Sequence, residues 1–293
     1  MFDEEDRKLS PTGGDVSQAP TLPNPPVDID RHTAQPRRMR DYLLGGAANF
    51  PVDREVTHYV SEVLPGGTDT ARAAFRAVRA FAVRVLRYLA AEVGMRQFLS
   101  VGTNLPTVEH FHETIQEIAP DARIVYVIDN DFVMAHAHRL CKGTPEGATA
   151  YIREMQCRPQ MMLAHAGETL DLSQPVAVFI QGVLLHLHDD EAYQVVSELL
   201  AGVAPGSSLA LYHLASDLLV EQTAVMWQRM RQMADESKMP QLIPRSRAGV
   251  SRFFEGLELV EPGVVPVEQW RPDPAEPLAG APTAVYGGVG RKP

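Results

Sequence analysis

Residues 97–107 read QFLSVGTNLPT, and this stretch decides the fold class of the chain. It joins a short apolar run, typical of a buried parallel strand, to a glycine turn, and Thr107 can cap the helix that follows. In doubly wound α/β folds a nucleotide-like ligand approaches the backbone at this turn, because glycine has no Cβ and the helix N-terminus presents free N–H groups. The stretch therefore makes Gly102, Thr103 and Asn104 candidates for cofactor binding. An ordinary strand-to-helix turn, with Asn104 in a left-handed conformation, is the alternative.

A carboxylate follows the next apolar run of the chain. Residues 123–128 read RIVYVI and are followed directly by Asp129, Asn130 and Asp131. An acid at the end of the second strand can accept hydrogen bonds from both ribose hydroxyls of a nucleoside. We therefore expect Asp129 and Asn130 to bind the same cofactor as the glycine turn. The alternative is that Asp129 or Asp131 only caps the helix that begins near Phe132.

Short apolar runs alternate with helical patterns over most of the chain. Beside the two runs already described, the expected strands cover residues 148–152, 176–181 and 208–213. This alternation is typical of an α/β fold with a doubly wound, mostly parallel sheet and helices on both faces. Residues 257–260 and 283–289 predict a late antiparallel hairpin at the edge of that sheet.

Composition and charge restrict the class of partner. Apolar residues make up 45% of the 293 residues and charged residues 22%, as in ordinary globular proteins. The formal net charge of −10 provides no positive field for nucleic acid or an anionic membrane, so we expect a small-molecule partner. The low cysteine content, the absence of a signal-like segment and the short apolar runs favour a cytoplasmic location and no membrane span. The sequence leaves the oligomeric state open.

Four groups of motifs together resemble one protein family. They are DYLLGG at 41–46 with NF at 49–50 and DRE at 53–55; RQFL at 96–99 with GT at 102–103 and LPT at 105–107; VYV at 125–127 with DND at 129–131; and FF at 253–254 with LELVEPG at 257–263 and WRP at 270–272. With these motifs the chain, from about residue 37 to its end, resembles the actinobacterial family of largely uncharacterised S-adenosylmethionine-dependent methyltransferases.

The resemblance implies a fold, a cofactor and a place for the substrate. The fold would be the class I methyltransferase, Rossmann-like fold, and S-adenosylmethionine would bind between the glycine turn and Asp129. Residues 42–49 would lie beside the active site, which makes Tyr42 and Asn49 candidates for substrate contact.

Three segments are expected along the chain. Residues 1–36 are rich in proline and polar residues and predict a flexible arm. Residues 37–94 predict an N-terminal helical lid, in which residues 70–93 form a long amphipathic helix. Residues 95–293 then form the methyltransferase-like α/β domain.

The chain departs from the family pattern where the cofactor would bind. Ser100 and Asn104 stand where the family usually has aspartate and glycine. The family usually also has an acidic residue after the third strand, and the matching position in this chain is near Met155. Ala47 and Ala48 replace a lysine and an aspartate. Losing the first aspartate removes an acceptor for the ammonium group of the ligand, which costs about tenfold to a hundredfold in affinity.

Three hypotheses of function follow from these residues. In the first, the protein methylates a small, fairly apolar metabolite, with an expected role in secondary metabolism. In the second, the scaffold no longer methylates and instead catalyses cyclisation or rearrangement of an apolar metabolite, which Ala47, Ala48 and Met155 favour because each makes its site less polar. In the third, the chain is a non-enzymatic metabolite sensor whose basic residues at 37, 38 and 40 engage a partner.

Histidine is the side chain best suited to act as a base near neutral pH. His186 follows the fourth strand and is the first candidate for a general base, and His213, at the end of the fifth, is the second. Tyr42 or Tyr212 can orient a substrate hydroxyl, and Gln181 can contact cofactor or substrate. The alternative for each is a side chain satisfied by a hydrogen bond to the backbone.

A wall of adaptable apolar side chains is expected in the last third of the chain. Met226, Trp227 and Met230 share a predicted helix and, with Met155, are candidates for substrate contact, although a helix packed on the core is the alternative. The run HLHDDE at 186–191 lacks a third histidine, so we expect caps and a solvated loop there and no metal site.

Overall fold

The computed structural model describes residues 30–102, 111–140, 143–155, 157–272 and 282–293, and most of the predicted arm, residues 1–29, lies outside them. Its centre is an eight-stranded sheet in the order β3-β2-β1-β4-β5-β8-β6, with β7 pairing β8. The strands are β1 Gln97–Val101, β2 Arg123–Ile128, β3 Ala148–Arg153, β4 Ala177–Gln181, β5 Ser208–Leu214, β6 Glu258–Leu259, β7 Val265–Pro266 and β8 Val285–Arg291. Strands β1 to β5 are parallel and β8 is antiparallel to its neighbours, which confirms the predicted α/β fold.

Helices cover both faces of this sheet. They are α1 Pro36–Leu43, α2 Pro51–Ser61, α3 Gly67–Arg87, α4 Phe111–Ile118, α5 Asp131–Leu140, α6 Pro159–Ala166, α7 Asp189–Ala201, α8 Val220–Asp235 and α9 Arg247–Ser251. The long helix expected at 70–93 is α3, continued by a π-helix over Tyr88–Glu92. The antiparallel hairpin expected from residues 257–260 and 283–289 is confirmed: β6 ends the sheet and pairs with β8, which in turn pairs with β5. Within the described part of the chain, no helix has the length and apolar character that a membrane span needs.

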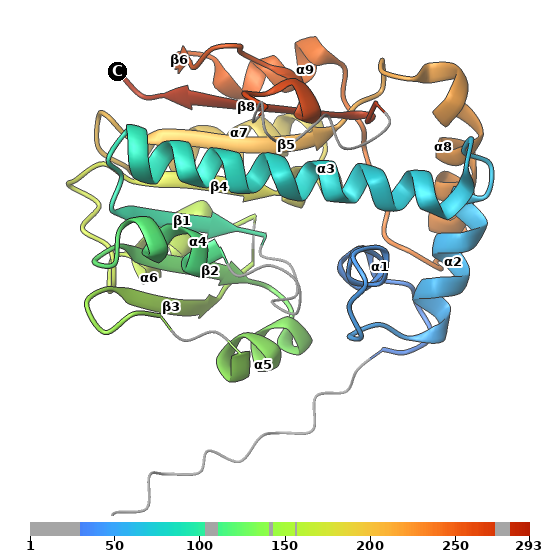
Figure 1. Ribbon diagram of the computed structural model, residues 1–293, viewed down its shortest axis with the longest axis horizontal. Helices are drawn as coiled ribbons and strands as arrows, with labels where there is room; N and C mark the ends of the chain where they lie inside the picture. The colour runs from blue at the N-terminus through green and yellow to red at the C-terminus, as the bar shows by residue number, and fades with distance from the viewer. Residues whose placement is uncertain (1–29, 103–110, 141–142, 156, 273–281) are drawn as a thin grey trace, which may run out of the picture.

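Two hydrophobic cores sandwich the sheet. On one face, α3 and α4 contribute the buried side chains of Phe81, Leu86 and Ile115. On the other face, α6 and α7 contribute Met162 and Leu199. Figure 1 shows α3 lying along the front of the sheet with α7 behind it. Burial on both faces explains why the strands read as continuous apolar runs.

The strand order reverses beside β1. Leu99 in β1 pairs with Val125 in β2 on one side and with Val178 in β4 on the other. The connections that follow these strands therefore leave in opposite directions, and a crevice opens at the carboxyl ends of β1 and β4. Gly102, which follows β1, lies directly beside Gln181, which ends β4.

A third, smaller core lies beyond the carboxyl edge of the sheet, where Figure 1 places α1, α2 and α8. Its apolar members are Ala34, Met39, Val56, Val60, Met233 and Met239. A buried ion pair, Arg38 Nε to Asp53 at 2.9 Å, joins α1 to α2, and Asp53 also accepts hydrogen bonds from the backbone N–H groups of Gln35 and Phe50. Since Asp53 is fully buried, these bonds are needed to keep its charge in the core.

Gly287→Ala tests the close packing of α3 on β8. A Cβ at Gly287 would lie 2.6 Å from the ring of Phe81, which is fully buried. We expect a loss of about 1–3 kcal/mol in the free energy of unfolding, measured with urea, because the ring must shift in a filled core. Gly167→Ala is the control: Gly167 has helical φ of −62°, its new Cβ would make ordinary contacts at 3.4 Å, and stability should hold or rise. Equal losses in both variants would contradict this packing.

Candidate functional site

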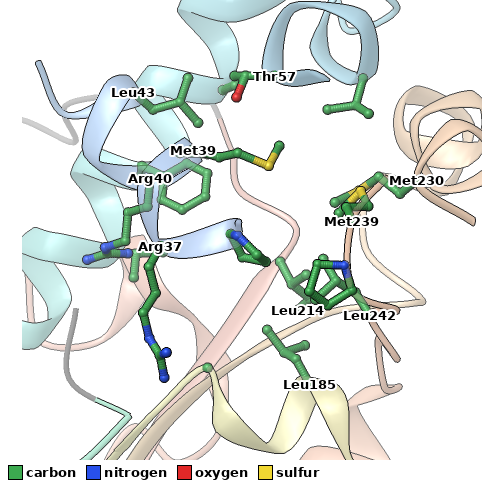
Figure 2. Close-up of a pocket in the computed structure, with 18 of the residues that line it drawn as sticks. Arg37, Met39, Arg40, Leu43, Thr57, Leu185, Leu214, Met230, Met239 and Leu242 are labelled. Carbon is green, nitrogen blue, oxygen red and sulfur yellow. The ribbon is translucent and has the colours of Figure 1, made fainter. Parts of the chain in front are cut away.

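A cavity of about 790 Å³ lies between the third core and the carboxyl edge of the sheet. Helices α1, α2, α3 and α8, the residues that follow β2 and β4, the end of β5, and the segments 239–242 and 282–285 line it. Figure 2 shows residues from α1, α8 and the segment that carries Leu242 facing the same space. The volume is that of a typical small-molecule site.

Most of the cavity wall is apolar. The side chains that make this wall are Met39, Leu43, Val60, Leu64, Phe75, Val78, Leu185, Leu214, Met226, Trp227, Met230, Met239 and Leu242. The predicted substrate contacts Met226, Trp227 and Met230 are therefore brought to one cavity by α8, together with Tyr212 from β5. Methionine side chains adapt to irregular apolar shapes, so this wall fits an apolar ligand.

Polar groups gather at the end of the cavity formed by the strands. Asp129, Asn130, Gln181 and His186, which the sequence singled out as candidate site residues, line this end, and Arg37 enters it from α1. Arg37 Nη1 lies 2.7 Å from Asp129 Oδ1, and the two side chains are 24% and 35% exposed. Figure 2 shows Arg37 extending away from Met39. The carboxylate predicted to bind ribose is thus exposed in the cavity and already holds one guanidinium.

The turn after β1 needs a glycine. Gly102 has φ of +86°, and a Cβ there would lie 2.4 Å from the carbonyl oxygen of Gln181. The Gln181 side chain donates from Nε2 to Ser100 Oγ at 2.9 Å, so the serine that replaces the family aspartate is bonded within the edge of the sheet. Both of these side chains are buried. The other two predicted residues of the turn, Thr103 and Asn104, lie outside the described residues.

The helix after β2 is capped by Asn130. Its Oδ1 accepts hydrogen bonds from the backbone N–H groups of Phe132 and Val133, at 3.0 and 3.2 Å. Asp131 instead forms an ion pair with Arg153, and this hydrogen bond lowers the pKa of the Asp131 carboxyl. Because Asn130 supplies the cap, Asp129 is not needed for it and its carboxylate stays in the cavity.

His186 ends the 3₁₀ helix that follows β4. Its Nδ1 lies 3.0 Å from the carbonyl oxygen of Gln241, which can only accept, so Nδ1 carries the proton and Nε2 of the neutral ring is a base. Burial lowers the pKa of His186 below its ordinary 6.5, and the charge of Arg37 lowers it further. The hydrogen bond to Gln241 and the charge of Asp129 act in the opposite direction. His186 is therefore neutral near pH 7.

His213 does not line the cavity with His186. It is buried, its Nδ1 donates to the carbonyl oxygen of Leu214 at 2.9 Å, and its Nε2 accepts from Arg245 Nη1 at 2.8 Å. Arg245 also donates to the carbonyl oxygens of Leu184 and Leu187, both at 2.7 Å, and pairs with Asp189. His213 thus helps to hold the segment that carries His186, which is a positioning role rather than substrate contact.

Three further residues predicted to touch substrate lie away from the cavity. Tyr42 hydrogen-bonds His58 Nε2 at 2.9 Å and lines a second hollow of about 430 Å³. Asn49 donates to Asp41 Oδ2 at 3.0 Å and fixes the turn after α1. Met155 is 51% exposed and is not among the residues of the cavity wall. Of the N-terminal motif, Leu43 lines the cavity, whereas Tyr42 and Asn49 form hydrogen bonds outside it.

Sequence reasoning assigned Arg37 to a partner contact and not to this cavity, and it did not identify Gln241. Arg37 belongs to a basic cluster just before the N-terminal motif, and its position there was the available signal. Gln241 acts through its backbone carbonyl, for which the side-chain sequence gives no signal. Within the part of the chain that the structure describes, no group of three or more histidine, cysteine or acidic residues is placed to hold a metal ion.

Comparison with known proteins gives one family and two similar solved structures. Residues 23–293 match the sequence model of a family described as S-adenosyl methyltransferase. A DUF574 family protein from Streptomyces avermitilis is 34% identical, with a TM-score of 0.81 over 90% of this chain and 99% of that one. A candidate methyltransferase from Thermobifida fusca is 31% identical, with a TM-score of 0.79 over 92% and 99%. No curated protein sequence matches.

A more distant structure shows the fold alone. Magnesium protoporphyrin IX methyltransferase from Synechocystis, solved with bound S-adenosylhomocysteine, is 10% identical and has a TM-score of 0.51, over 87% of this chain and 93% of that one. The predicted class I methyltransferase fold is confirmed by this likeness and by the sheet order.

The buried state of His213 predicts a stability loss in acid. Burial is the main cause that lowers its pKa from 6.5 to about 4, with a contribution from Arg245 and opposition from the Leu214 carbonyl and Asp189. The unfolded chain binds a proton near 6.5 and the folded protein only near 4, so this stabilisation is complete above pH 6.5 and is lost as pH falls through that window. In wild type this group makes the free energy of unfolding, measured with urea, fall by up to about 1.4 kcal/mol per pH unit as the pH is lowered from 6.5 to 4. His213→Gln should remove this part of the pH dependence. Parallel stability curves for the two proteins would contradict the assignment.

Proposed function

The chain belongs to the S-adenosyl methyltransferase family, and we propose that it transfers a methyl group to a small, fairly apolar metabolite bound in the 790 Å³ cavity. One observation carries this proposal: a single cavity has an apolar wall and, at the carboxyl ends of the strands, a group of polar side chains. S-adenosylmethionine is the cofactor, and when bound it supplies an electrophilic methyl group. For a small, apolar acceptor of this kind we expect the enzyme to act in secondary metabolism. We expect its location to be the cytoplasm.

The residues at the strand edge fit this cofactor. Asp129 exposes its carboxylate in the cavity at the end of β2, where it can accept from both ribose hydroxyls. A carboxylate has about four lone-pair sites, so Asp129 can hold Arg37 and the ribose together. The Ser100–Gln181 pair is neutral, so an ammonium group nearby gains no ion pair from it, which supports an affinity below that of aspartate-bearing relatives.

His186 is the residue we assign as general base. Its neutral Nε2 can take a proton from an acceptor hydroxyl, while the bond from Nδ1 to the Gln241 carbonyl fixes the ring. The apolar wall excludes water from the acceptor and holds it by its body. Tyr212, which lines the same cavity, remains our candidate for orienting the acceptor.

The two alternative functions lose the observations that favoured them. Ala47, Ala48 and Met155 suggested a pocket converted to cyclisation, but none of them belongs to the cavity wall that the structure describes. Arg37, Arg38 and Arg40 were expected to engage a partner in a sensor, but Arg38 and Arg40 are buried and Arg37 pairs with Asp129 in the cavity. Methyl transfer therefore keeps the stronger support.

Cofactor binding is tested by Asp129→Asn. We expect S-adenosylhomocysteine to bind the variant about tenfold or more weakly in calorimetry, because the ribose loses charge-assisted hydrogen bonds. Asp131→Asn is the matched control, since Asp131 is occupied by Arg153 and the change removes the same charge two residues away. Undiminished affinity in the Asp129 variant, or an equal loss in both, would reject the assigned ribose site.

The base is tested by the pH dependence of turnover. With an acceptor found by screening apolar hydroxylated compounds for S-adenosylhomocysteine release, the wild-type rate should rise with pH through a pKa below 6.5 and then level, because only neutral His186 takes the proton. His186→Gln should lower kcat by about a hundredfold or more and remove that rise. His58→Gln, a change outside the cavity wall, is the control. Retention of both rate and profile in the His186 variant would exclude it as the base.

A further inference from the structure

Arg37 is held in the cavity by a single contact. Its Nη1 pairs with Asp129, and among the described residues no other hydrogen bond engages its guanidinium. An arginine has five N–H donors in a rigid fork, so most of the donors of Arg37 remain for a ligand. The side chain is only 24% exposed, and leaving those donors without a partner in a partly dry site is unfavourable.

The neighbouring arginines of α1 have other tasks. Arg38 is buried and donates to Asp53 and to the carbonyl oxygens of Asp30 and Thr33. Arg40 is also buried, with its guanidinium over the rings of Phe75 and Tyr212 at 5.5 and 6.0 Å. Arg38 therefore stabilises the packing of α1 on α2, and Arg40 packs against aromatic rings of the cavity wall. Consecutive helical residues point about 100° apart, which is how one turn of α1 supplies a structural arginine and a cavity arginine.

Arg37 and His186 both line the polar end of the cavity, together with Asp129. The charge of Arg37 lowers the pKa of His186, while that of Asp129 raises it. The other ionisable groups near this end are committed elsewhere, because Asp131 pairs with Arg153 and the carboxylate of Asp30 accepts from backbone N–H groups at 32 and 33. A ligand oxygen beside His186 thus meets one base and one cation.

We propose that Arg37 binds the acceptor oxygen of the methyl transfer, so that the substrate is an apolar body with a weakly acidic hydroxyl, a phenol or an enol. This proposal rests on the proposed function. A base and a cation on one oxygen suit such a hydroxyl, because the cation stabilises the oxyanion that the base produces. An aliphatic alcohol is too weak an acid to ionise there, and a carboxylic acid needs no base.

The step balances with the groups present. The acceptor O–H bond breaks and its proton goes to Nε2 of His186, while the oxyanion pairs with Arg37. The oxygen electron pair forms a bond to the methyl carbon as the bond from that carbon to sulfur breaks, and the sulfur keeps those electrons. The products are a methyl ether and S-adenosylhomocysteine, and His186 returns its proton to water.

The test follows the ionisation of a chromogenic phenol bound to the full chain. With saturating S-adenosylhomocysteine, para-nitrophenol is titrated with pH and its yellow phenolate is read by absorbance. We expect the acid dissociation constant of the bound probe to rise about tenfold or more over that of the free probe, because the phenolate gains charge-assisted bonds. Arg37→Gln should abolish this rise. Arg72→Gln, which removes the same charge outside this cavity, should retain it.

Two matched probes and a second variant complete the design. Nitrobenzene, which lacks the hydroxyl, should bind more weakly than para-nitrophenol to wild type and equally to wild type and Arg37→Gln. Arg37→Lys keeps the charge without the fork and should give a smaller rise; it decides the question if the glutamine variant does not fold. An unchanged rise in Arg37→Gln, failure of wild type to bind the phenol, or a preference for para-nitrobenzoate would overturn the proposal. Failure of S-adenosylhomocysteine to bind wild type would instead overturn the proposed function.

Discussion

The reversal of strand order beside β1 is the constraint on which the site depends. Because β1 has β2 on one side and β4 on the other, the residues that end these three strands come together at one crevice. Gly102 leaves β1 with a left-handed turn, Asp129 follows β2, and Gln181 ends β4. A sheet with consecutive strands in spatial order would spread the same residues along its edge.

Helices α1, α2 and α8 cover one side of this crevice. The buried pair between Arg38 and Asp53 fixes α1 against α2, and α1 then directs Arg37 to Asp129. On the far side, α8 adds Met230 and its neighbours to complete an apolar wall. The site therefore has two parts: the strand ends supply the polar edge, and helices α1, α2, α3 and α8 supply most of the apolar wall. Arg37 joins α1 to the polar edge through Asp129.

The sequence predicted the parts of the site that follow from local pattern. Strand ends can be read from apolar runs, so Asp129, Gln181 and His186 were recognised as candidates for cofactor or substrate contact, and the structure brings all three to one cavity. His213 also ends a strand, but its Nε2 is occupied by a hydrogen bond from Arg245, a residue 32 positions later in the chain. The periodicity of a sequence carries no information on such long-range pairing.

The lid was predicted less well for the same reason. Tyr42 and Asn49 belong to the N-terminal motif, and the resemblance implied a place beside the active site, but their hydrogen bonds stay within the lid and α3. Helix periodicity identified the apolar face of α8 but could not say whether it packs on a core or lines a cavity. The structure shows both, with Met233 in the third core and Met226 in the cavity wall.

The most direct test of this account is a crystal structure of the full chain with S-adenosylhomocysteine. The account predicts the ribose hydroxyls on the Asp129 carboxylate, the sulfur turned toward His186, and the apolar cavity under α1 and α8 still open for an acceptor. A ligand bound elsewhere on the surface, or one that fills the apolar volume while Asp129 keeps Arg37 alone, would contradict the division of the site into a cofactor edge and an acceptor wall.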